Sequence, residues 1–204
     1  MSQPDFAGAI EHALLRLERE LAPELVYHSV YHTRDDVLPA VEWLAALEHI
    51  SDEQLALLRT AAAFHDIGFI EQAREHEKIG VRIAGETLPR FGFTVAQIRQ
   101  IGRMIRATQL SQTPETVLEQ ILVDADLDVF GRDDFMRRNA DLRAELAARG
   151  QLATDAEWLG SQMDFLSTHH YFTAAAQRTR TAMKQRNLEM LAERLKETAA
   201  IPAT

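Results

Sequence analysis

Apolar residues recur at intervals of three and four along most of the chain, the spacing that gives an α-helix one buried face. Leu14, Leu17 and Leu21 carry this stripe through the first segment, from about Phe6 to Leu21. No segment alternates apolar and polar residues over a useful length, and neither an internal repeat nor a low-complexity linker interrupts the pattern. The pattern therefore predicts an all-α protein.

Capping and turn residues divide this pattern into separate helices. Three pairs have the spacing of a capping box, which marks a helix start: Ser51 with Gln54, Thr94 with Gln97, and Thr154 with Glu157. Thr113-Pro114 predicts a further start, because proline is favoured at the first helical position. The expected helices cover about 6–21, 37–49, 51–65, 75–88, 94–105, 113 into the acidic residues near 124, 131–150, a segment from 154, and a long final segment after 173.

Composition limits the architecture and the partners. The 204 residues suffice for one domain with a good core, and the 46% hydrophobic and 26% charged fractions are typical of a soluble globular protein. A formal net charge of −9 argues against general affinity for nucleic acid, which needs a basic surface. It leaves open a small phosphorylated substrate, because a bound metal can reverse the local sign of charge.

Three further features predict a cytoplasmic protein without membrane contact. No apolar segment approaches the roughly 20 residues that span a bilayer. The first residues, Met-Ser-Gln-Pro-Asp, lack the basic and apolar regions of a signal peptide. The chain has no cysteine, which fits a reducing compartment and leaves His, Asp, Glu or backbone oxygen as the only metal ligands.

The candidate chemistry centres on the doublet His65-Asp66, which follows the apolar run Ala61–Phe64. His32 lies upstream, and the acidic cluster Asp124-Ala125-Asp126 lies downstream. Each group stands at the edge of an apolar segment, so packing of the helices can bring all of them around one cation. Mixed nitrogen and oxygen ligands suit Mn, Fe, Co, Ni or Zn better than Ca. Such an ion lowers the pKa of bound water and neutralises charge on phosphoryl oxygens.

Each of these residues also has an ordinary structural interpretation. His32 could cap a helix or lie on the surface, and His65-Asp66 could be a helix C-terminal histidine followed by a turn. Asp124, Asp126 and Asp128 could form a solvated acidic face, although apolar residues on both sides place some of them beside the core. A buried carboxylate without a partner is costly, so the combined pattern favours a metal site.

The order of these residues resembles the HD-domain superfamily of metal-dependent phosphohydrolases. The similarity extends over longer stretches, from about residue 25 to residue 135: Tyr31-His32-Thr33, Ala61 through Phe69, His76-Glu77 ahead of Ile79-Gly80, and Ile121 through Asp128. Trp158 and His169–Thr173 resemble a bacterial subgroup that occurs alone or attached to signalling domains. The resemblance implies a single helical bundle of HD type over 1–204, with its core at about 25–135 and helices over 136–199 packed on it.

The resemblance also implies a set of site residues. His32, His65, Asp66 and Asp126 would bind a divalent ion (Mn, Fe, Co, Ni, Zn or Mg), and Asp66 could bridge to a second ion. Asp66 and Glu77 would be catalytic, although Glu77 could instead cap its helix or form a salt bridge. His76 is either a ligand of a second ion or a helix N-terminal residue.

Other residues near the expected site have open roles. Asp126 is favoured as the last ligand, and Asp124 would then orient a ligand or be structural. The choice between Asp124 and Asp126 stays open. His28 could share a helical face with His32 and support the site or be purely structural. The segment 105–109, where a further histidine would be sought, has none, which favours one metal.

Basic residues near these motifs in sequence suggest a phosphate site, formed by one or two of Lys78, Arg82 and Arg106. The expected activity is metal-dependent cleavage of a phosphate ester of a small molecule, a nucleotide or cyclic nucleotide, by metal-activated water. The alternative is a metal- and nucleotide-binding regulatory module with little or no turnover. The late segment carries a basic cluster, which is typical of a solvated helix or one that faces a second copy in a homodimer. Its members are Arg178, Arg180, Lys184 and Arg186.

Overall fold

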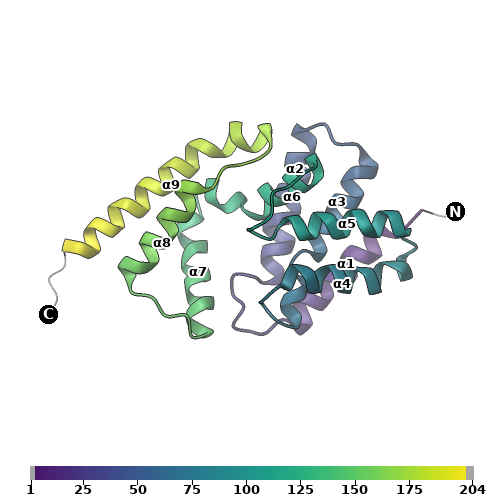
Figure 1. Cartoon of the computed structure of the whole chain (residues 1–204), viewed down its shortest axis with the longest axis horizontal. Coiled ribbons are helices and arrows are strands. Elements are labelled where there is room, and N and C mark those ends of the chain that lie inside the picture. Colours follow the sequence, from purple (N-terminus) through teal and green to yellow (C-terminus); the bar gives the residue numbers. More distant parts are fainter. Residues whose placement is uncertain (1–2, 201–204) are drawn as a thin grey trace.

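Residues 3–200 are described by a computed structural model, and every regular element in that range is helical. The nine α-helices of this range are joined in part by short helical turns (Figure 1). The α-helices are α1 (Phe6–Glu20), α2 (Leu38–Leu47), α3 (Asp52–Phe64), α4 (His76–Thr87), α5 (Val95–Ala107), α6 (Val117–Asp126), α7 (Phe135–Ala148), α8 (Asp155–Thr168) and α9 (Ala174–Ala200). The turns are η1 (His32–Val37, π-helical), η2 (Ile67–Ile70), η3 (Leu88–Phe91) and η4 (Asp128–Gly131). The all-α prediction is confirmed, and none of the described helices has the length and apolar character needed to cross a membrane.

Helix starts follow the capping residues. The predicted capping boxes at Ser51, Thr94 and Thr154 are all present, each with both of its reciprocal hydrogen bonds. The start predicted at Thr113-Pro114 is wrong, because the helix begins only at Val117. Thr116 and Glu119 form a full capping box there, and the Glu119 carboxylate also accepts a 2.7 Å hydrogen bond from the backbone N–H of Glu115.

Helix α3 lies in the centre of the group formed by α1–α6. Its residues Ala61, Ala62, Ala63 and Phe64 are all 0% exposed, and the helix packs against α1, α2 and α5. Three consecutive alanines allow these neighbours to approach the α3 backbone closely, as dense core packing requires. The end of α3, where His65 follows, therefore lies inside the molecule.

Helices α7, α8 and α9 form a second group at one side of the first (Figure 1). Helix α9 packs on α8 and η4 and also contacts α2. At its start, the Asp124 carboxylate of α6 accepts hydrogen bonds from the backbone N–H groups of Phe172 (2.9 Å) and Thr173 (2.7 Å). Farther along α9, Arg180 pairs with Asp128 at 2.6 Å and stacks on the Trp43 ring. Polar contacts thus fasten the C-terminal helices to the rest of the molecule.

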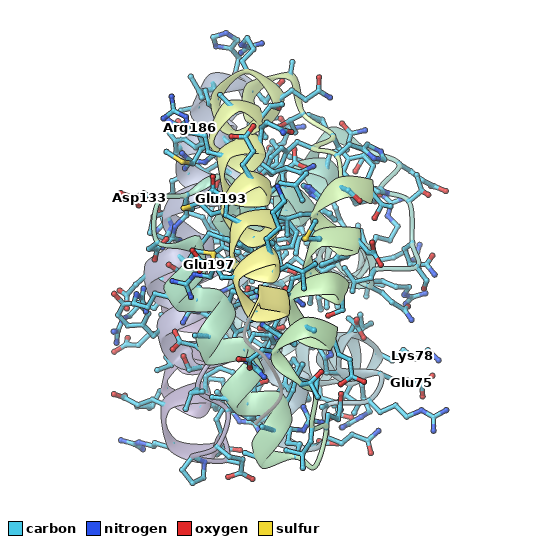
Figure 2. All side chains as sticks on the ribbon, turned by 90° about the vertical axis from the view of Figure 1, so that its left-hand side faces the viewer. Glu75, Lys78, Asp133, Arg186, Glu193 and Glu197 are labelled. Atoms are coloured by element: carbon cyan, nitrogen blue, oxygen red, sulfur yellow. The ribbon has the colours of Figure 1, made fainter. Side chains whose placement is uncertain are left out.

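The outer face of α9 carries charges of both signs, among them Arg186, Glu193 and Glu197 (Figure 2). Two members of the predicted basic cluster are engaged within the chain. Arg180 binds Asp128, and the Lys184 ammonium group donates to the backbone carbonyl of His169. The homodimer stays a prediction.

Candidate metal centre

Three separated segments bring their predicted ligands together. His32 begins η1, His65-Asp66 follows α3, and Asp126 ends α6. The Asp126 Oδ1 atom lies 3.0 Å from His32 Nε2 and 3.4 Å from His65 Nε2. Asp66 Oδ2 lies 3.3 Å from His65 Nε2, and one donor atom from each of His32, His65 and Asp66 lies within 4.8 Å of the others.

The position of His76 depends on a close approach between the turn η2 and helix α4. A Cβ atom on Gly68 would lie only 2.0 Å from the backbone oxygen of His76, so only glycine permits this packing. The contact places His76 Nε2 3.4 Å from Asp66 Oδ1. Asp66 therefore directs one carboxylate oxygen to His65 and the other to His76.

Backbone carbonyls fix the orientation of two imidazole rings. His65 Nδ1 lies 2.7 Å from the oxygen of Ala62, and His76 Nδ1 lies 3.1 Å from the oxygen of Ala73. A carbonyl only accepts, so each Nδ1 is the protonated nitrogen and donates to it. The Nε2 lone pair of each ring is then available to a metal ion.

A carboxylate held by two arginines stands behind His32. Asp36 Oδ2 lies 3.6 Å from His32 Nδ1, while the same carboxylate binds Arg132 at 2.6 Å and Arg138 at 3.2 Å. Both His32 and Asp36 belong to the π-helical turn η1, a widened turn of a kind frequent at functional sites. The arginines lie after residue 128, so the C-terminal part of the chain fixes a group that orients this ring.

His28 is oriented in a similar way by the buried Glu145 of α7. The Glu145 carboxylate lies 2.6 Å from His28 Nδ1 and accepts 2.9 Å hydrogen bonds from the backbone N–H groups of Tyr27 and His28. The Phe69 ring stacks on the His28 ring, with 4.4 Å between the ring centroids. The His28 side chain is thereby held at the edge of the cluster.

The donor set fits a divalent cation. His65 Nε2 and Asp66 Oδ2 are buried and have no hydrogen-bond partner among the described residues, although they lie 3.3 Å apart. Buried polar atoms without partners are costly, so two of them facing one point indicate that a further group binds there. Imidazole nitrogens with carboxylate oxygens suit Mn, Fe, Co, Ni or Zn.

Electrostatics keep the two carboxylates of this cluster charged. Burial alone would raise the pKa of Asp66 and of Asp126, but the adjacent histidines hold both pKa values below the usual range. Burial alone would lower the pKa of His32 and His65, and the same carboxylates outweigh it and raise these values. These opposite shifts show that the cluster favours positive charge between its carboxylates, which a bound metal ion would supply.

The structure separates the two candidates for the last ligand. Asp126 lies at the cluster, whereas Asp124 is turned to the start of α9, where it binds the backbone of Phe172 and Thr173. Asp128, the third acid of this run, binds Arg180. The geometry therefore brings only Asp126 of the three to His32 and His65.

A cleft of about 240 Å³ opens onto the cluster. Its polar lining comprises Tyr27, His28, Asp66, His76, Glu77, Thr108, Asp126 and Gln162, and its apolar lining comprises Leu110, Leu127, Phe130, Leu142 and Phe165. Glu77 is buried, and its Oε2 atom lies 3.7 Å from His76 Nδ1. Within the segment where a further histidine would be sought, Thr108 reaches the cleft.

The basic residues predicted to hold phosphate lie elsewhere. Lys78 projects from the surface and pairs with Glu75 (Figure 2), and Arg82 pairs with Glu71 at 2.6 Å. Arg106 is exposed. None of these three cations lines the cleft, so the structure corrects the expectation that they meet a substrate there.

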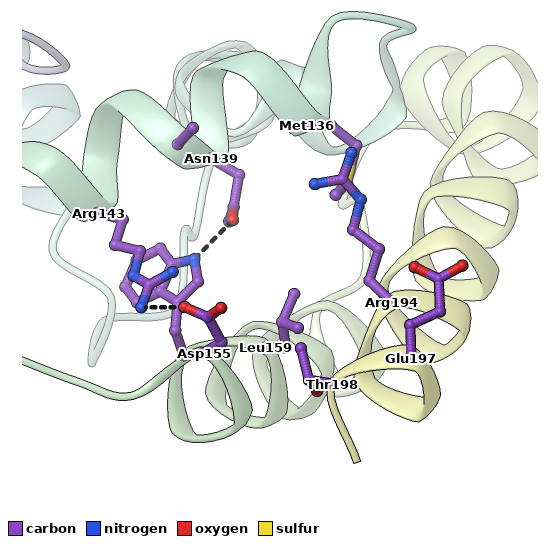
Figure 3. A pocket seen from close by; sticks show the side chains of 10 residues that line it. Met136, Asn139, Arg143, Asp155, Leu159, Arg194, Glu197 and Thr198 are labelled. Carbon is purple, nitrogen blue, oxygen red and sulfur yellow. Dashed lines mark hydrogen bonds and ion pairs between the residues drawn. The ribbon is translucent and has the colours of Figure 1, made fainter. Parts of the chain in front are cut away.

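A larger hollow of about 390 Å³ lies among α7, α8 and α9, and two pairs of its polar side chains bind each other (Figure 3). Trp158 donates to Asn139 at 2.8 Å, and Arg143 binds Asp155 at 2.7 Å. This hollow has no group of metal-ligating side chains comparable with the cluster around His65. The chemistry therefore belongs to the smaller cleft.

Sequence reasoning missed the groups that support the ligands. Asp36 follows His32 by four residues, a spacing that places both on one helical face and could have signalled the pair. Arg132, Arg138 and Glu145 carry no such signal, because they are brought to the site by tertiary packing alone.

Comparisons with known proteins agree with this geometry. The model of the HD domain family matches residues 15–128, which include every residue of the cluster. A crystal structure described as a predicted HD superfamily hydrolase, from an uncultured Thermotogales bacterium, has a TM-score of 0.59 and 20% sequence identity. That likeness covers 97% of this chain and 92% of the other and shows the shared fold. A search of curated proteins gave no match.

Proposed function

We propose that this chain, which belongs to the HD domain family, is a metal-dependent phosphohydrolase that cleaves a phosphate ester of a small molecule. One observation carries the proposal. His65 Nε2 and Asp66 Oδ2 are buried without hydrogen-bond partners beside His32 and Asp126, where the cleft reaches the cluster. This arrangement is typical of a site that holds a divalent ion within reach of a ligand.

The proposed roles follow from the position of each side chain. His32, His65, Asp66 and Asp126 would hold the ion through their Nε2 and carboxylate oxygen atoms. A divalent ion in this position supplies a water of lowered pKa and offsets negative charge on the phosphoryl oxygens. Asp66 also faces His76, so the same carboxylate could serve a second ion.

Glu77 and His76 would act on the substrate side of the ligands. Both line the cleft, and Glu77 is an acceptor placed to take a proton from the attacking water. His76 has its Nδ1 proton directed to Ala73, which leaves Nε2 for a second ion or, when protonated, for a phosphoryl oxygen. The sequence resemblance suggests a nucleotide or cyclic nucleotide as substrate, whereas the lining of the cleft favours a different ester.

The test is hydrolysis of p-nitrophenyl phosphate by protein loaded separately with Mn, Fe, Co, Ni, Zn or Mg. We expect hydrolysis with at least one ion and its loss in Asp66→Ala. Asp133→Ala is the matched control, because Asp133 is an exposed carboxylate away from the cleft (Figure 2). Metal-loaded protein that binds phosphate esters without cleaving any of them would overturn the proposal in favour of a regulatory binding module.

A further inference from the structure

The cleft has two chemically different sides. Asp66, His76, Glu77 and Asp126 form its polar side, next to the cluster. Leucine and phenylalanine side chains form the other: Leu110, Leu127, Phe130, Leu142 and Phe165. A substrate that spans the cleft would place a phosphoryl group at the first side and its organic group against the second.

The C-terminal helices supply much of the apolar side. Leu142 lies on α7 and Phe165 on α8, both beyond residue 128, where the HD domain match ends. The Phe165 ring meets the Phe130 ring edge to face, with 5.3 Å between centroids, which fixes its position. Features outside the family match therefore shape the part of the cleft that faces an organic group.

The charges around the cleft favour a single phosphoryl group. No lysine or arginine occurs among the described residues that line it. Sites for di- and triphosphates depend on such cations, because each phosphoryl group adds negative charge that must be offset. A single phosphoryl group brings less negative charge into this cleft than a di- or triphosphate would.

Two hydrogen-bonding atoms of the outer cleft already have partners within the chain. The Gln162 carbonyl oxygen accepts a 2.6 Å bond from Asn139, and the Thr108 hydroxyl donates a 2.8 Å bond to the carbonyl of Ile105. A nucleoside adds sugar hydroxyls and a base edge, and any of these polar groups left unpaired against the apolar side would be unfavourable. Leu110, by contrast, is 70% exposed and offers apolar surface to a ligand.

The dimensions agree with a compact group. Sites for drug-sized ligands occupy roughly 300–1,000 Å³, and this cleft measures about 240 Å³. We propose that the site selects phosphate monoesters of compact apolar alcohols or phenols, with Leu142 and Phe165 as residues that determine specificity. This inference rests on the proposed phosphohydrolase function.

The reaction requires no co-reactant besides water. The water oxygen bonds to phosphorus, and the bond between phosphorus and the ester oxygen breaks. The ester oxygen leaves with a proton as the alcohol or phenol, and inorganic phosphate remains. No oxidation or reduction takes place.

The test compares kcat/KM of the metal-loaded full chain on phenyl phosphate, butyl phosphate, glycerol phosphate, a nucleoside 5′-monophosphate and a nucleoside triphosphate. We expect the phenyl and butyl esters to exceed the other three by about 10-fold or more, the discrimination that a few apolar contacts provide. A nucleotide or glycerol phosphate with the highest kcat/KM would overturn the inference and leave the phosphohydrolase function intact. Hydrolysis of none of the five esters would instead overturn the proposed function itself, and the inference with it.

Two variants test whether the apolar side of the cleft determines which ester is hydrolysed. In Leu142→Gln we expect kcat/KM for butyl phosphate to fall about 10-fold relative to that for glycerol phosphate. Leu152→Gln is the control, because Leu152 is 82% exposed and does not line the cleft. Phe165→Ala should raise the ratio of naphthyl to phenyl phosphate hydrolysis by enlarging the cleft. Unchanged ratios in both cleft variants, with metal content and melting temperature preserved, would show that these residues do not determine specificity.

Discussion

Helices α1–α6 and helices α7–α9 contribute different things to one site. The first group supplies His32, His65, Asp66 and Asp126. The segment after residue 128 supplies the groups that hold the supporting side chains and close the cleft: Arg132, Arg138, Glu145, Leu142 and Phe165. The family match at 15–128 thus accounts for the ligands, whereas orientation and the shape of the cleft come in large part from outside it.

The two groups are also held together differently. The centre of the first consists of apolar side chains with no exposure, such as Ala62 and Phe64. The second contributes Leu166 and Leu191 to the same core and is attached in addition through polar contacts. Among these, the side-chain amide of Asn187 donates 2.8 Å bonds to the carbonyls of Phe130 and Arg132. Changes to the four ligands in the first group should therefore abolish chemistry, while changes to the supporting residues in the second should adjust affinity, selectivity or stability.

The largest expected difference lies within one turn of α6. Asp126→Ala should lose the metal and activity, with kcat/KM falling on the order of 10³-fold because several kcal/mol of charge stabilisation disappear. Asp124→Asn should keep the metal and lose about 1–3 kcal/mol of unfolding free energy, since its contacts are to the start of α9. Metal analysis with urea unfolding checks both, and the reverse pattern would exchange the two roles.

An intermediate effect is expected where the second group orients a ligand of the first. Asp36→Asn should weaken metal affinity about 10- to 100-fold, because His32 loses the carboxylate behind its Nδ1 atom. Asp35→Asn is the neighbouring control, since Asp35 pairs at the surface with Arg34. Competition with a chelating dye measures both metal affinities. Equal affinities in the two variants would show that Asp36 does not support His32 as a metal ligand.

A smaller effect concerns the pH dependence of stability in the second group. Burial lowers the pKa of His169 to about 3, with the positive charges of Lys184 and His170 adding to the shift. Below about pH 6.5 the His169 side chain binds a proton in the unfolded chain but not in the folded protein. Its contribution to the free energy of unfolding is therefore fully present above pH 6.5 and falls as the pH decreases toward 3. The contribution amounts to about 2 kcal/mol between pH 7 and pH 5.

His169→Phe removes the titrating ring while keeping an aromatic group beside Phe130 and Tyr171. Urea unfolding measures the loss of unfolding free energy between pH 7 and pH 5. We expect this loss to be about 2 kcal/mol smaller in the variant than in the wild type. The same loss in both proteins would show that His169 is not the source of the pH dependence.

The smallest expected effect is at the exposed cations of the first group. Lys78→Ala, Arg82→Ala and Arg106→Ala should each leave kcat/KM for phenyl phosphate within about 2-fold of the wild type, because none of the three side chains lines the cleft. Steady-state kinetics at constant ionic strength checks this. A loss of 10-fold or more in any of the three would restore the phosphate contact predicted for that residue.

The fold and the ligands were accessible from sequence because local signals carry both. Capping boxes such as that at Ser51 fix helix starts, and apolar residues on each side of His65 and Asp126 place these ligands at the core. Thr116 and Glu119 have the same spacing and mark the observed start of α6, whereas the proline at residue 114 does not.

The rest of the site depends on tertiary packing. Glu145 lies 117 residues after His28 in the sequence, and Arg132 lies 96 residues after Asp36. No local sequence pattern therefore predicts either contact. Nearness in sequence to His76 was the basis for expecting Lys78 at the phosphate site, because Lys78 follows His76 by two residues. That step turns a side chain about 200° around a helix of 3.6 residues per turn and places Lys78 on the far side of α4.

The central claim is that His65 and its neighbours hold a metal ion. The most direct test is elemental analysis of the full chain, purified without chelator or affinity nickel, beside His65→Ala prepared in the same way. We expect about one equivalent of Mn, Fe, Co, Ni or Zn per chain in the wild type, or more if a second ion binds, and its loss in the variant. Folded wild-type protein that binds none of these ions, even after incubation with each, would contradict it.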